Sequence, residues 1–478
     1  MSPEVIRFGT DGWRGVVGRE FTFANVRRVA AAIAAHLEEQ GTAGRGVAVG
    51  YDRRFLSEGF AAEVAGVLAA RGVPVLLADA HLPTPALSWG VREQGLAGGI
   101  MVTASHNPYE WNGVKFKEPF GGSARAVTNA AVEAILDREF PDGESIPCLS
   151  LTEARRRDGV AGFEWWAGYA EGVRRFVDLD AIRAGRLAVG VDAMHGSGSP
   201  WLRRLLEEAG CRVLELHAGW NPAFGGRSPE PIDENLRGLS ALVTAEGLAL
   251  GLANDGDADR IGAMDERGRF FSPQRILAVF LRYLREEKGL DGAVVRAVSA
   301  TSLLDLLAAQ YGLETVLTPV GFKHAGEVML ARPVLLGGEE SGGIGIGAHL
   351  PERDGILNAL VLAELVARTG KGLRGYLQEV FDRVGHFTYR RLDLSLDPAG
   401  IARARERIAA LDPPQTLAGR PVRDVITLDG TKFVRDDHSW LLLRPSGTEP
   451  LVRVYAEARS GAEVQELIDE GRRLLGEE

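Results

Sequence analysis

Residues 46–52 read GVAVGYD, and a related string, LAVGVDA, stands at residues 187–193. Both strings are short apolar runs, which favours strands buried in a sheet that is covered on both faces. They share the pattern (Val or Leu)-Ala-Val-Gly-x-Asp, with Asp52 and Asp192 at its end. The recurrence indicates that the chain uses one kind of structural unit more than once.

A helical stretch and a second strand follow each of these runs. Three copies of this strand–helix–strand order are present: residues 46–52, 59–71 and 73–79; residues 187–193, 201–210 and 211–217; and residues 293–299, 303–311 and 313–319. They predict an α/β fold with three similar α/β units and mixed sheets. The alternative is one large doubly wound sheet, which the different polar motifs between the copies disfavour.

The C-terminal part has a different order. It comprises a helix at Pro398–Leu411, hairpin strands within Val422–Phe433, strands at Trp440–Leu443 and Leu451–Ala456, and a helix at Ala462–Leu475. This order predicts a C-terminal α+β domain with an antiparallel sheet. Irregular sequence marks boundaries near residues 142–147 and 385–396, and the second stretch is also a candidate hinge. The predicted domains are residues 1–147, 148–268, 269–384 and 385–478.

The composition is that of an ordinary globular protein. The 478 residues are 45% hydrophobic and 25% charged, which supports several cores. The formal net charge is −10 and no long Lys/Arg run is present, so we expect no nucleic-acid partner. An anionic substrate then requires Arg and Lys side chains that are concentrated locally, in a cleft.

Two cysteines, Cys148 and Cys211, are too few for a disulfide framework. The first ten residues lack the apolar core of a signal peptide, and no apolar run reaches membrane-spanning length. We therefore expect a cytoplasmic protein without a membrane partner. The sequence gives no indication of the oligomeric state.

The first polar loop of interest is Thr103-Ala104-Ser105-His106-Asn107-Pro108. It follows the apolar run Ala97–Val102, so Ser105 is expected where a strand ends and a loop begins. Strand ends in α/β folds are common ligand sites. The alternative is a polar turn whose histidine is hydrogen-bonded for structural reasons.

The second loop carries Asp255, Asp257 and Asp259 directly after the apolar run Leu248–Ala253. Three carboxylates so close together repel one another, and a hard divalent cation such as Mg²⁺ or Ca²⁺ relieves this repulsion. An EF-hand fits the spacing, but Arg260 stands where its sharp turn needs glycine. A solvated acidic turn is the remaining alternative.

Two further loops combine glycine with polar side chains. Glu339 and Ser341 lie within Gly337–Gly343, where they offer an acceptor and a hydroxyl that suit a sugar. Arg444, Ser446, Gly447 and Thr448 lie within Arg444–Pro450, a plausible phosphate cradle that Arg453 follows. Ordinary tight turns are the alternative for both loops.

Taken together, these strings resemble the α-D-phosphohexomutase superfamily, the phosphoglucomutases and phosphomannomutases. The family's motifs occur in the family's order: FGTDGWRG at Phe8–Gly15, TASHNP at Thr103–Pro108, DGDADR at Asp255–Arg260, GEESGG at Gly338–Gly343 and RPSGTEP at Arg444–Pro450. The resemblance covers nearly the whole chain. It implies three related α/β domains and a C-terminal phosphate-binding domain around a central cleft, each lending one loop.

The resemblance also implies a role for each candidate residue. Ser105 carries the phosphate, and Asp255, Asp257 and Asp259 hold Mg²⁺ together with a phosphoserine oxygen of Ser105. Glu339 and Ser341 contact sugar hydroxyls. The residues that grip the phosphate that is not reacting are Arg444, Ser446, Gly447 and Thr448, and Arg453 is a further substrate-binding candidate. The basic residues near the transferred group are Arg14, Lys115 and Arg260, and the further acid–base candidates are Lys323 and His106.

The implied activity is the interconversion of hexose 1-phosphate and hexose 6-phosphate through a hexose 1,6-bisphosphate, with glucose 1,6-bisphosphate as activator. Phosphoserine and three aspartates carry more negative charge than Mg²⁺ offsets, which is a physical reason to place Arg14, Lys115 and Arg260 nearby. The base is Lys115 or Lys323, provided that the pKa of that lysine is depressed.

The sugar and the reaction class leave alternatives. The double-Glu form of the third loop favours glucose phosphate, with mannose phosphate second and glucosamine phosphate third. One alternative is a phosphatase with an aspartyl nucleophile, in which neither the Ser105 loop nor the Arg444 loop has a role. A sugar-phosphate-binding protein without catalysis is the third class.

Overall fold

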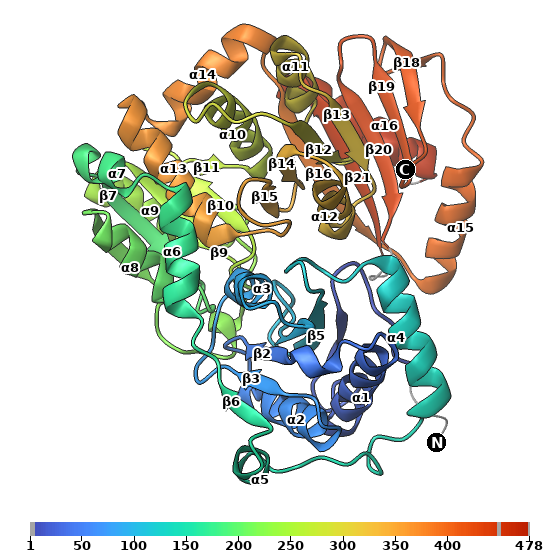
Figure 1. The fold of residues 1–478 in the computed structure, drawn as a ribbon. Coiled ribbons are helices and arrows are strands. Elements are labelled where there is room, and N and C mark those ends of the chain that lie inside the picture. Colours follow the sequence, from blue (N-terminus) through green and yellow to red (C-terminus); the bar gives the residue numbers. More distant parts are fainter. Residues whose placement is uncertain (1–4, 447–450, 477–478) are drawn as a thin grey trace. The chain divides into compact units, whose positions relative to one another are not determined.

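The computed structural model describes residues 5–446 and 451–476, and it divides the chain into two compact units (Figure 1). The first unit consists of Met1–Pro273, Gly326–Arg332 and Ser341–Arg374. The second consists of Gln274–Ala325, Pro333–Glu340 and Gly375–Glu478.

The first sheet of the first unit has six strands in the order β1-β5-β4-β2-β3-β6. Their bounds are β1 Trp13–Val16, β2 Val47–Tyr51, β3 Val75–Leu77, β4 Gly98–Val102, β5 Trp111–Lys117 and β6 Val160–Gly162. β2 is parallel to β3 and β4, whereas β5 is antiparallel to β4 and β1, so the sheet is mixed. β6 adds a strand from beyond the predicted boundary at residue 147.

Helices cover both faces of this sheet (Figure 1). They are α1 Phe23–Glu39, α2 Ser57–Ala70, α3 Thr84–Glu93 and α4 Ala126–Glu139, with the short α5 Leu151–Arg156 and the 3₁₀ turn η1 Ala43–Arg45 beside them. α1 contacts α2 and α4, and all three contribute to one apolar core, whereas α3 packs on β2 and β4. All five residues of β2 are buried, as expected of a strand covered on both sides.

The second sheet has five strands in the order β11-β10-β9-β7-β8. Their bounds are β7 Ala188–Asp192, β8 Arg212–Leu216, β9 Leu250–Asn254, β10 Ile261–Met264 and β11 Phe270–Phe271. β7 is parallel to β8 and β9, and β10 is antiparallel to β9 and β11. The accompanying helices are α6 Trp166–Phe176, α7 Leu179–Gly185, α8 Trp201–Glu208, η2 Phe224–Gly226, α9 Arg237–Glu246 and α13 Gly355–Thr369.

The second unit begins with a parallel set of strands in the order β13-β12-β14. The bounds are β12 Ala293–Ala297, β13 Thr315–Thr318 and β14 Val334–Gly338, and β15 Ile344–Ile346 lies in a segment of the first unit. The helices of this part of the chain are α10 Pro273–Glu286, α11 Ser302–Tyr311, α12 Phe322–Ala331 and α14 Leu373–Val384, and residues 326–331 of α12 belong to the first unit.

The C-terminal sheet is antiparallel, with the order β16-β21-β20-β19-β18-β17. Its elements are β16 Thr388–Ser395, α15 Pro398–Ala409, β17 Thr416–Leu417, β18 Arg420–Ile426, β19 Thr431–Arg435, β20 Trp440–Pro445, β21 Leu451–Ala458 and α16 Gly461–Leu475. Leu441 and Leu443 of β20 face a core shared with α15 and α16. Trp440 and Leu442 face the other way and pack with Val298, which follows β12.

These sheets confirm the predicted fold class of three α/β units and a C-terminal α+β domain, and the single large sheet is wrong. The predicted cleft stays a prediction. Most of the stretch 385–396, which the sequence analysis treated as a boundary and a hinge, forms β16, because Thr388–Ser395 pairs along its full length with β21.

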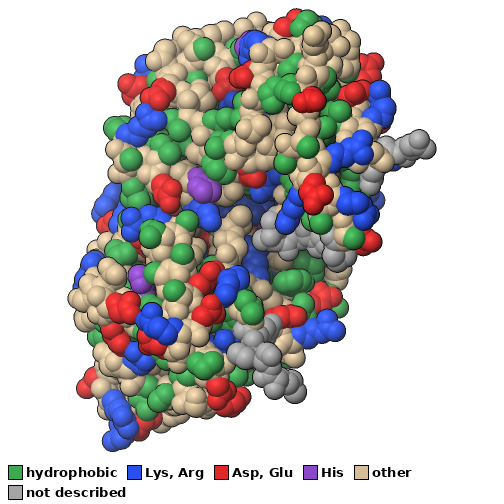
Figure 2. All heavy atoms as spheres, turned by 90° about the vertical axis from the view of Figure 1, so that its right-hand side faces the viewer, with side chains coloured by type: hydrophobic (Ala, Val, Ile, Leu, Met, Phe, Trp, Pro, Cys, Tyr) green, Lys and Arg blue, Asp and Glu red, His purple; other side chains and the backbone are tan. Residues whose placement is uncertain are grey.

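The surface agrees with the charge balance of the sequence, and the helices agree with the absence of long apolar runs. On the face shown in Figure 2, acidic and basic side chains are interspersed with hydrophobic ones, in line with 55 Lys/Arg and 65 Asp/Glu residues. Among the residues that the structure describes, no helix combines the length and the apolarity that crossing a bilayer requires.

Candidate active site

Ser105 lies just after β4 and is held in an unusual backbone conformation. Its φ angle is +52°, in the left-handed region that few residues other than glycine adopt. Its N–H donates to Thr103 Oγ1 (2.9 Å), and Thr103 in turn donates to Asp52 Oδ2 (2.7 Å). The Ser105 hydroxyl donates to Asp255 Oδ2 at 2.7 Å, although the two residues are 150 positions apart.

Arg54 holds the backbone of this loop. Its guanidinium donates to the carbonyl oxygens of Ser105 (2.6 Å), Asn107 (2.7 Å), Pro108 (2.8 Å) and Trp111 (3.0 Å). The side chain is completely buried, and Asp52 lies 3.2 Å from its Nε. No role was predicted for Arg54 from the sequence. Its one signal is that it follows β2, at the carboxyl end of a buried strand.

Asp255, Asp257 and Asp259 form the loop between β9 and β10, and all three are completely buried. Each offers a carboxylate oxygen within 4.8 Å of the others. One oxygen of Asp257 and one of Asp259, the Oδ1 atom in each case, are buried without a hydrogen-bond partner in residues 5–446 and 451–476. Buried carboxylate oxygens are normally paired, so these two suit a cation.

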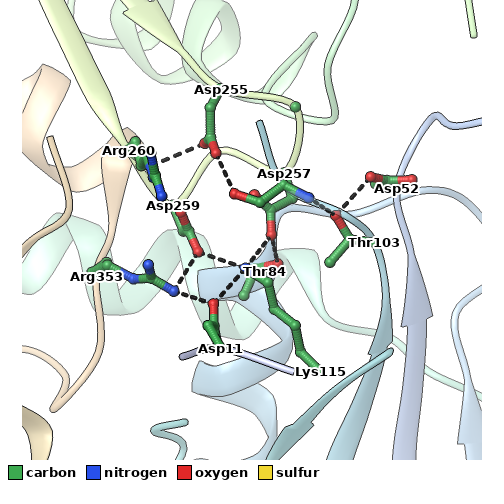
Figure 3. A network of polar contacts seen from close by, with 12 residues as sticks. Asp11, Asp52, Thr84, Thr103, Lys115, Asp255, Asp257, Asp259, Arg260 and Arg353 are labelled. Atoms are coloured by element: carbon green, nitrogen blue, oxygen red, sulfur yellow. Dashed lines mark hydrogen bonds and ion pairs between the residues drawn. The ribbon is translucent and has the colours of Figure 1, made fainter. Parts of the chain in front are cut away.

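Lys115 of β5 gives this acidic loop a fixed positive charge. Its Nζ lies 2.8 Å from carboxylate oxygens of Asp11, Asp257 and Asp259 (Figure 3). Burial favours the neutral amine, but the three carboxylates outweigh burial, and the net effect raises the pKa of Lys115 above its usual value. Lys115 is therefore an ammonium in this arrangement.

Arg353, which precedes α13, is a second cation beside the trio. Its Nη2 is 2.8 Å from Asp259 Oδ2 and also contacts Asp11 (Figure 3). Neighbouring Glu352 binds Lys117 Nζ at 2.7 Å. Arg353, Glu352 and Lys117 were not predicted from the sequence, because their partners are distant in the chain. Asp11 belongs to the first motif, Phe8–Gly15, from which no role was predicted for it.

The charges within the trio are unequal. Burial and repulsion from Asp257 and Asp259 raise the pKa of Asp255 well above its usual value. Burial also opposes ionisation of Asp257, but Lys115 and a hydrogen bond from Thr84 lower the pKa of Asp257 overall. Asp255, the aspartate bound to Ser105, thus holds a proton more readily than Asp257 does.

The other basic candidates of the first unit contact either the Ser105 loop or the acidic loop. Arg14 of β1 donates to Asn107 Oδ1, and the backbone N–H of Arg260 donates to Asp255 Oδ1 at 3.1 Å. Burial, aided by Arg260 and Arg14, lowers the pKa of His106 well below its usual value. The His106 imidazole is therefore neutral at pH 7 and is suited to hydrogen bonding rather than to carrying charge.

The remaining candidates divide between the units. Ser341 lies in a segment of the first unit, and Lys323, Glu339, Arg444, Ser446 and Arg453 lie in the second. Glu339 Oε1 accepts the Gly321 N–H at 2.9 Å, and Arg444 Nε donates to Asp429 Oδ2 at 2.9 Å. The predicted phosphate-binding residues Gly447 and Thr448 lie outside the described residues.

The structure thus brings a buried serine together with an acidic trio at the strand ends of two α/β sheets, an arrangement suited to phosphoryl transfer. All four domain models of the phosphoglucomutase/phosphomannomutase family match the chain. Domain I matches residues 5–142, domain II residues 167–268, domain III residues 272–384 and the C-terminal domain residues 397–474. The chain belongs to this family, part of the α-D-phosphohexomutase superfamily, whose enzymes are isomerases that move a phosphoryl group within a hexose phosphate.

Similar proteins carry names that differ in the sugar. A phosphoglucomutase/phosphomannomutase of Thermococcus kodakarensis is 32% identical over 98% of this chain and 98% of its own. A phosphoglucosamine mutase of Carboxydothermus hydrogenoformans is 30% identical over 97% of both chains. A solved structure, a candidate phosphomannomutase from Thermus thermophilus, has a TM-score of 0.86 at 38% identity and covers 100% of both chains. The similarity defines the phosphohexomutase class without defining the sugar.

Proposed function

We propose that this chain interconverts hexose 1-phosphate and hexose 6-phosphate by way of a phosphate carried on Ser105. The observation that carries the proposal is the 2.7 Å hydrogen bond between the Ser105 hydroxyl and Asp255 Oδ2. It unites a serine and an acidic loop from two different sheets. An ordinary polar turn does not require such a partner.

The donor set of the acidic loop fits Mg²⁺. Its ligands are carboxylate oxygens alone, which a hard cation prefers, and the unpartnered Oδ1 atoms of Asp257 and Asp259 supply two of them beside Asp255. When bound, Mg²⁺ neutralises and polarises the transferring phosphoryl oxygens. Lys115 and Arg353 hold the opposite oxygens of Asp257 and Asp259, so they fix which oxygen each carboxylate offers.

The transfer itself exchanges one phosphorus–oxygen bond for another. The bond between phosphorus and Ser105 Oγ breaks, a bond to a sugar hydroxyl oxygen forms, and the hydroxyl proton passes to a base. The hexose 1,6-bisphosphate then turns round, and its other phosphoryl group moves to Ser105. Glucose 1,6-bisphosphate from solution primes the serine in the same way. Phosphoryl transfer depends chiefly on alignment and on charge neutralisation, and the buried loop that Arg54 fixes supplies the alignment.

We assign different roles to the two candidate lysines. The raised pKa of Lys115 makes it a poor proton acceptor and a good counter-ion for phosphoryl oxygens. The base is then Lys323, which lies in the first turn of α12. Arg14 and Arg260 add positive charge near Ser105, and His106 contributes a neutral hydrogen-bonding ring.

We assign the phosphate that is not reacting to the C-terminal domain. Arg444 of β20 and Arg453 of β21 stand directly opposite each other. Asp429 pairs with Arg444 and Asp393 with Arg453, and a phosphate bound between the two guanidiniums would compensate their positive charges further. Ser446 follows Arg444, and Gly447 and Thr448 complete this assignment by sequence alone. Glu339 and Ser341 are assigned to sugar hydroxyls.

We favour glucose phosphate as the substrate because the third loop has the double-Glu form GEESGG. The test is a coupled isomerase assay with Mg²⁺ and glucose 1,6-bisphosphate, in which the 1-phosphates of glucose, mannose and glucosamine are compared. The highest kcat/KM is expected for glucose 1-phosphate. A higher value for mannose or glucosamine phosphate would reassign the sugar and retain the chemistry.

The same reactions also separate a mutase from a phosphatase. A mutase produces hexose 6-phosphate with little free phosphate, whereas a phosphatase releases inorganic phosphate in step with substrate loss. Release of free phosphate without any hexose 6-phosphate would overturn the proposal.

A further inference from the structure

Asp429 stands in the turn between β18 and β19, which packs directly against β20. The next residue, Gly430, has a φ angle of +80°, and a Cβ there would lie 2.4 Å from the Leu443 carbonyl oxygen and 3.0 Å from the Arg444 Cα. Only a glycine allows this approach. The turn therefore places the Asp429 carboxylate beside the side chain of Arg444.

One oxygen of Asp429 joins two segments. Asp429 Oδ2 accepts a hydrogen bond from Arg444 Nε and another from the Val320 N–H, each at 2.9 Å. The next amide, that of Gly321, donates to Glu339 Oε1 at 2.9 Å. Two consecutive amides are thus held by two carboxylates, and the loop that they fix leads into α12 and Lys323.

An ordinary hairpin ion pair does not explain this arrangement. The Asp429 side chain is 23% exposed and that of Arg444 is 9% exposed, and ion pairs near the surface add little to stability. The carboxylate instead acts on geometry. With its Nε–H engaged, Arg444 has its guanidinium plane fixed, and its two Nη groups form the edge that can bind an anion bidentately.

On the basis of the proposed function, we infer that Asp429 is a positioning residue for the substrate's non-reacting phosphate. It orients Arg444 toward that phosphate, and it also holds the Val320–Lys323 segment at a fixed position beside Arg444. Asp429 itself does not contact the substrate. Its effect on binding must therefore pass through Arg444, and this requirement gives the inference a sharp test.

The test is a double-mutant cycle on the full chain with glucose 1-phosphate. Asp429→Asn and Arg444→Ala are measured singly and together for kcat and KM, and the binding of glucose 1-phosphate is measured calorimetrically in a Ser105→Ala background. We expect Asp429→Asn to raise KM about tenfold, as for the loss of a hydrogen bond to a charged group. In KM and in binding affinity the double variant should match Arg444→Ala alone, because Asp429 then has no guanidinium to orient, whereas an effect through the Val320–Lys323 segment would appear in kcat.

Two further variants complete the design. Asp424→Asn, at an exposed aspartate of the same hairpin, should leave KM unchanged. Asp429→Glu keeps the charge but moves the carboxylate, so its KM should lie between those of the unaltered chain and Asp429→Asn. This variant also serves if the Asn variant folds poorly.

The outcomes distinguish this inference from the function on which it rests. If Arg444→Ala raises KM but Asp429→Asn behaves like Asp424→Asn, the positioning role is wrong and the mutase assignment stands. Additive effects on KM or on binding in the double variant also overturn the positioning role. Absence of mutase turnover in the unaltered chain overturns both.

Discussion

Ser105 is the residue that forms and breaks a covalent bond to phosphorus in the proposed mechanism. Ser105→Ala removes the oxygen that accepts the phosphoryl group, so we expect mutase turnover to fall at least ~10³-fold. The fold should persist, because the buried hydroxyl is replaced by a smaller side chain and Arg54 still binds the loop carbonyls. Turnover and intact-protein mass after incubation with glucose 1,6-bisphosphate are the measurements.

The control for this variant is Ser145→Ala, at an exposed serine outside the site. It should gain one phosphate and turn over normally. Phosphate incorporation into Ser105→Ala at the level of the control, or appreciable mutase turnover in that variant, would remove Ser105 from the carrier role.

Asp255 gives a prediction about stability and pH. Folding raises its pKa, so the folded state binds the proton more tightly than the unfolded chain does. Stability from this group is present at low pH and is lost as the pH rises through the folded-state pKa. In EDTA, Asp255→Asn should therefore raise Tm by about 2 °C or more at about pH 8, with a smaller gain at about pH 5.

Thermal unfolding at both pH values, with and without Mg²⁺, checks this prediction. Mg²⁺ should stabilise the unaltered chain by mass action and should stabilise Asp255→Asn much less, since a carboxylate ligand is lost. Asp233→Asn, at an exposed aspartate, should behave like the unaltered chain. An equal Mg²⁺ response in both aspartate variants would contradict the assignment of Asp255 as a ligand.

At the scale of elements, the Ser105 loop depends on a single side chain at the end of β2. Arg54→Lys keeps the charge, but one ammonium cannot reach four carbonyl oxygens that a planar guanidinium serves at once. We expect kcat to fall more than tenfold with a smaller change in KM, and stability to fall by about 3 kcal/mol because buried carbonyls lose their donors.

Neighbouring Arg53 supplies the matched control, since it is partly exposed and donates to Ala218 O rather than to the Ser105 loop. Arg53→Lys should leave kcat nearly unchanged. Steady-state kinetics give kcat, and chemical denaturation gives the free energy of unfolding, for both variants. A normal kcat in Arg54→Lys would show that the loop keeps its shape without this arginine.

The elements themselves were predictable because their signals are local. Apolar runs such as 46–52 and 187–193 predicted strands, and polar punctuation after them predicted where Ser105 and Asp255 lie. The support of the site was not predictable in this way. Arg54 and Arg353 bind groups more than 50 positions away along the chain, and no periodicity or spacing records such contacts.

The same distinction between local and distant signals explains why no strand was predicted in the stretch 385–396. Few local signals separate an extended linker from an edge strand, and the pairing of Thr388–Ser395 with β21 depends on a partner more than 50 residues later. Local composition therefore suggested a hinge where the folded chain has a full strand. A movement of the C-terminal domain that keeps this pairing must therefore carry β16 along with β21.

At the scale of the whole molecule, the chain forms two compact units, and this division predicts how it unfolds. Ser105 and the acidic trio all belong to the first unit, whereas β12 and the C-terminal sheet share contacts within the second. We expect calorimetry to resolve two transitions. Mg²⁺ should raise the temperature of the first unit's transition alone, because a ligand stabilises only the part that binds it.

Trp440 identifies the other transition. This β20 residue is fully buried and packs with Val298 and Tyr455, and its Nε1–H donates to Glu457 Oε2 at 2.9 Å, so Trp440→Ala should cost about 3–5 kcal/mol. That cost should fall on the transition that Mg²⁺ does not move. Trp220→Ala, at a tryptophan of the first unit that is 68% exposed, should shift neither transition. A single transition that responds equally to Mg²⁺ and to Trp440→Ala would mean that the two units unfold as one.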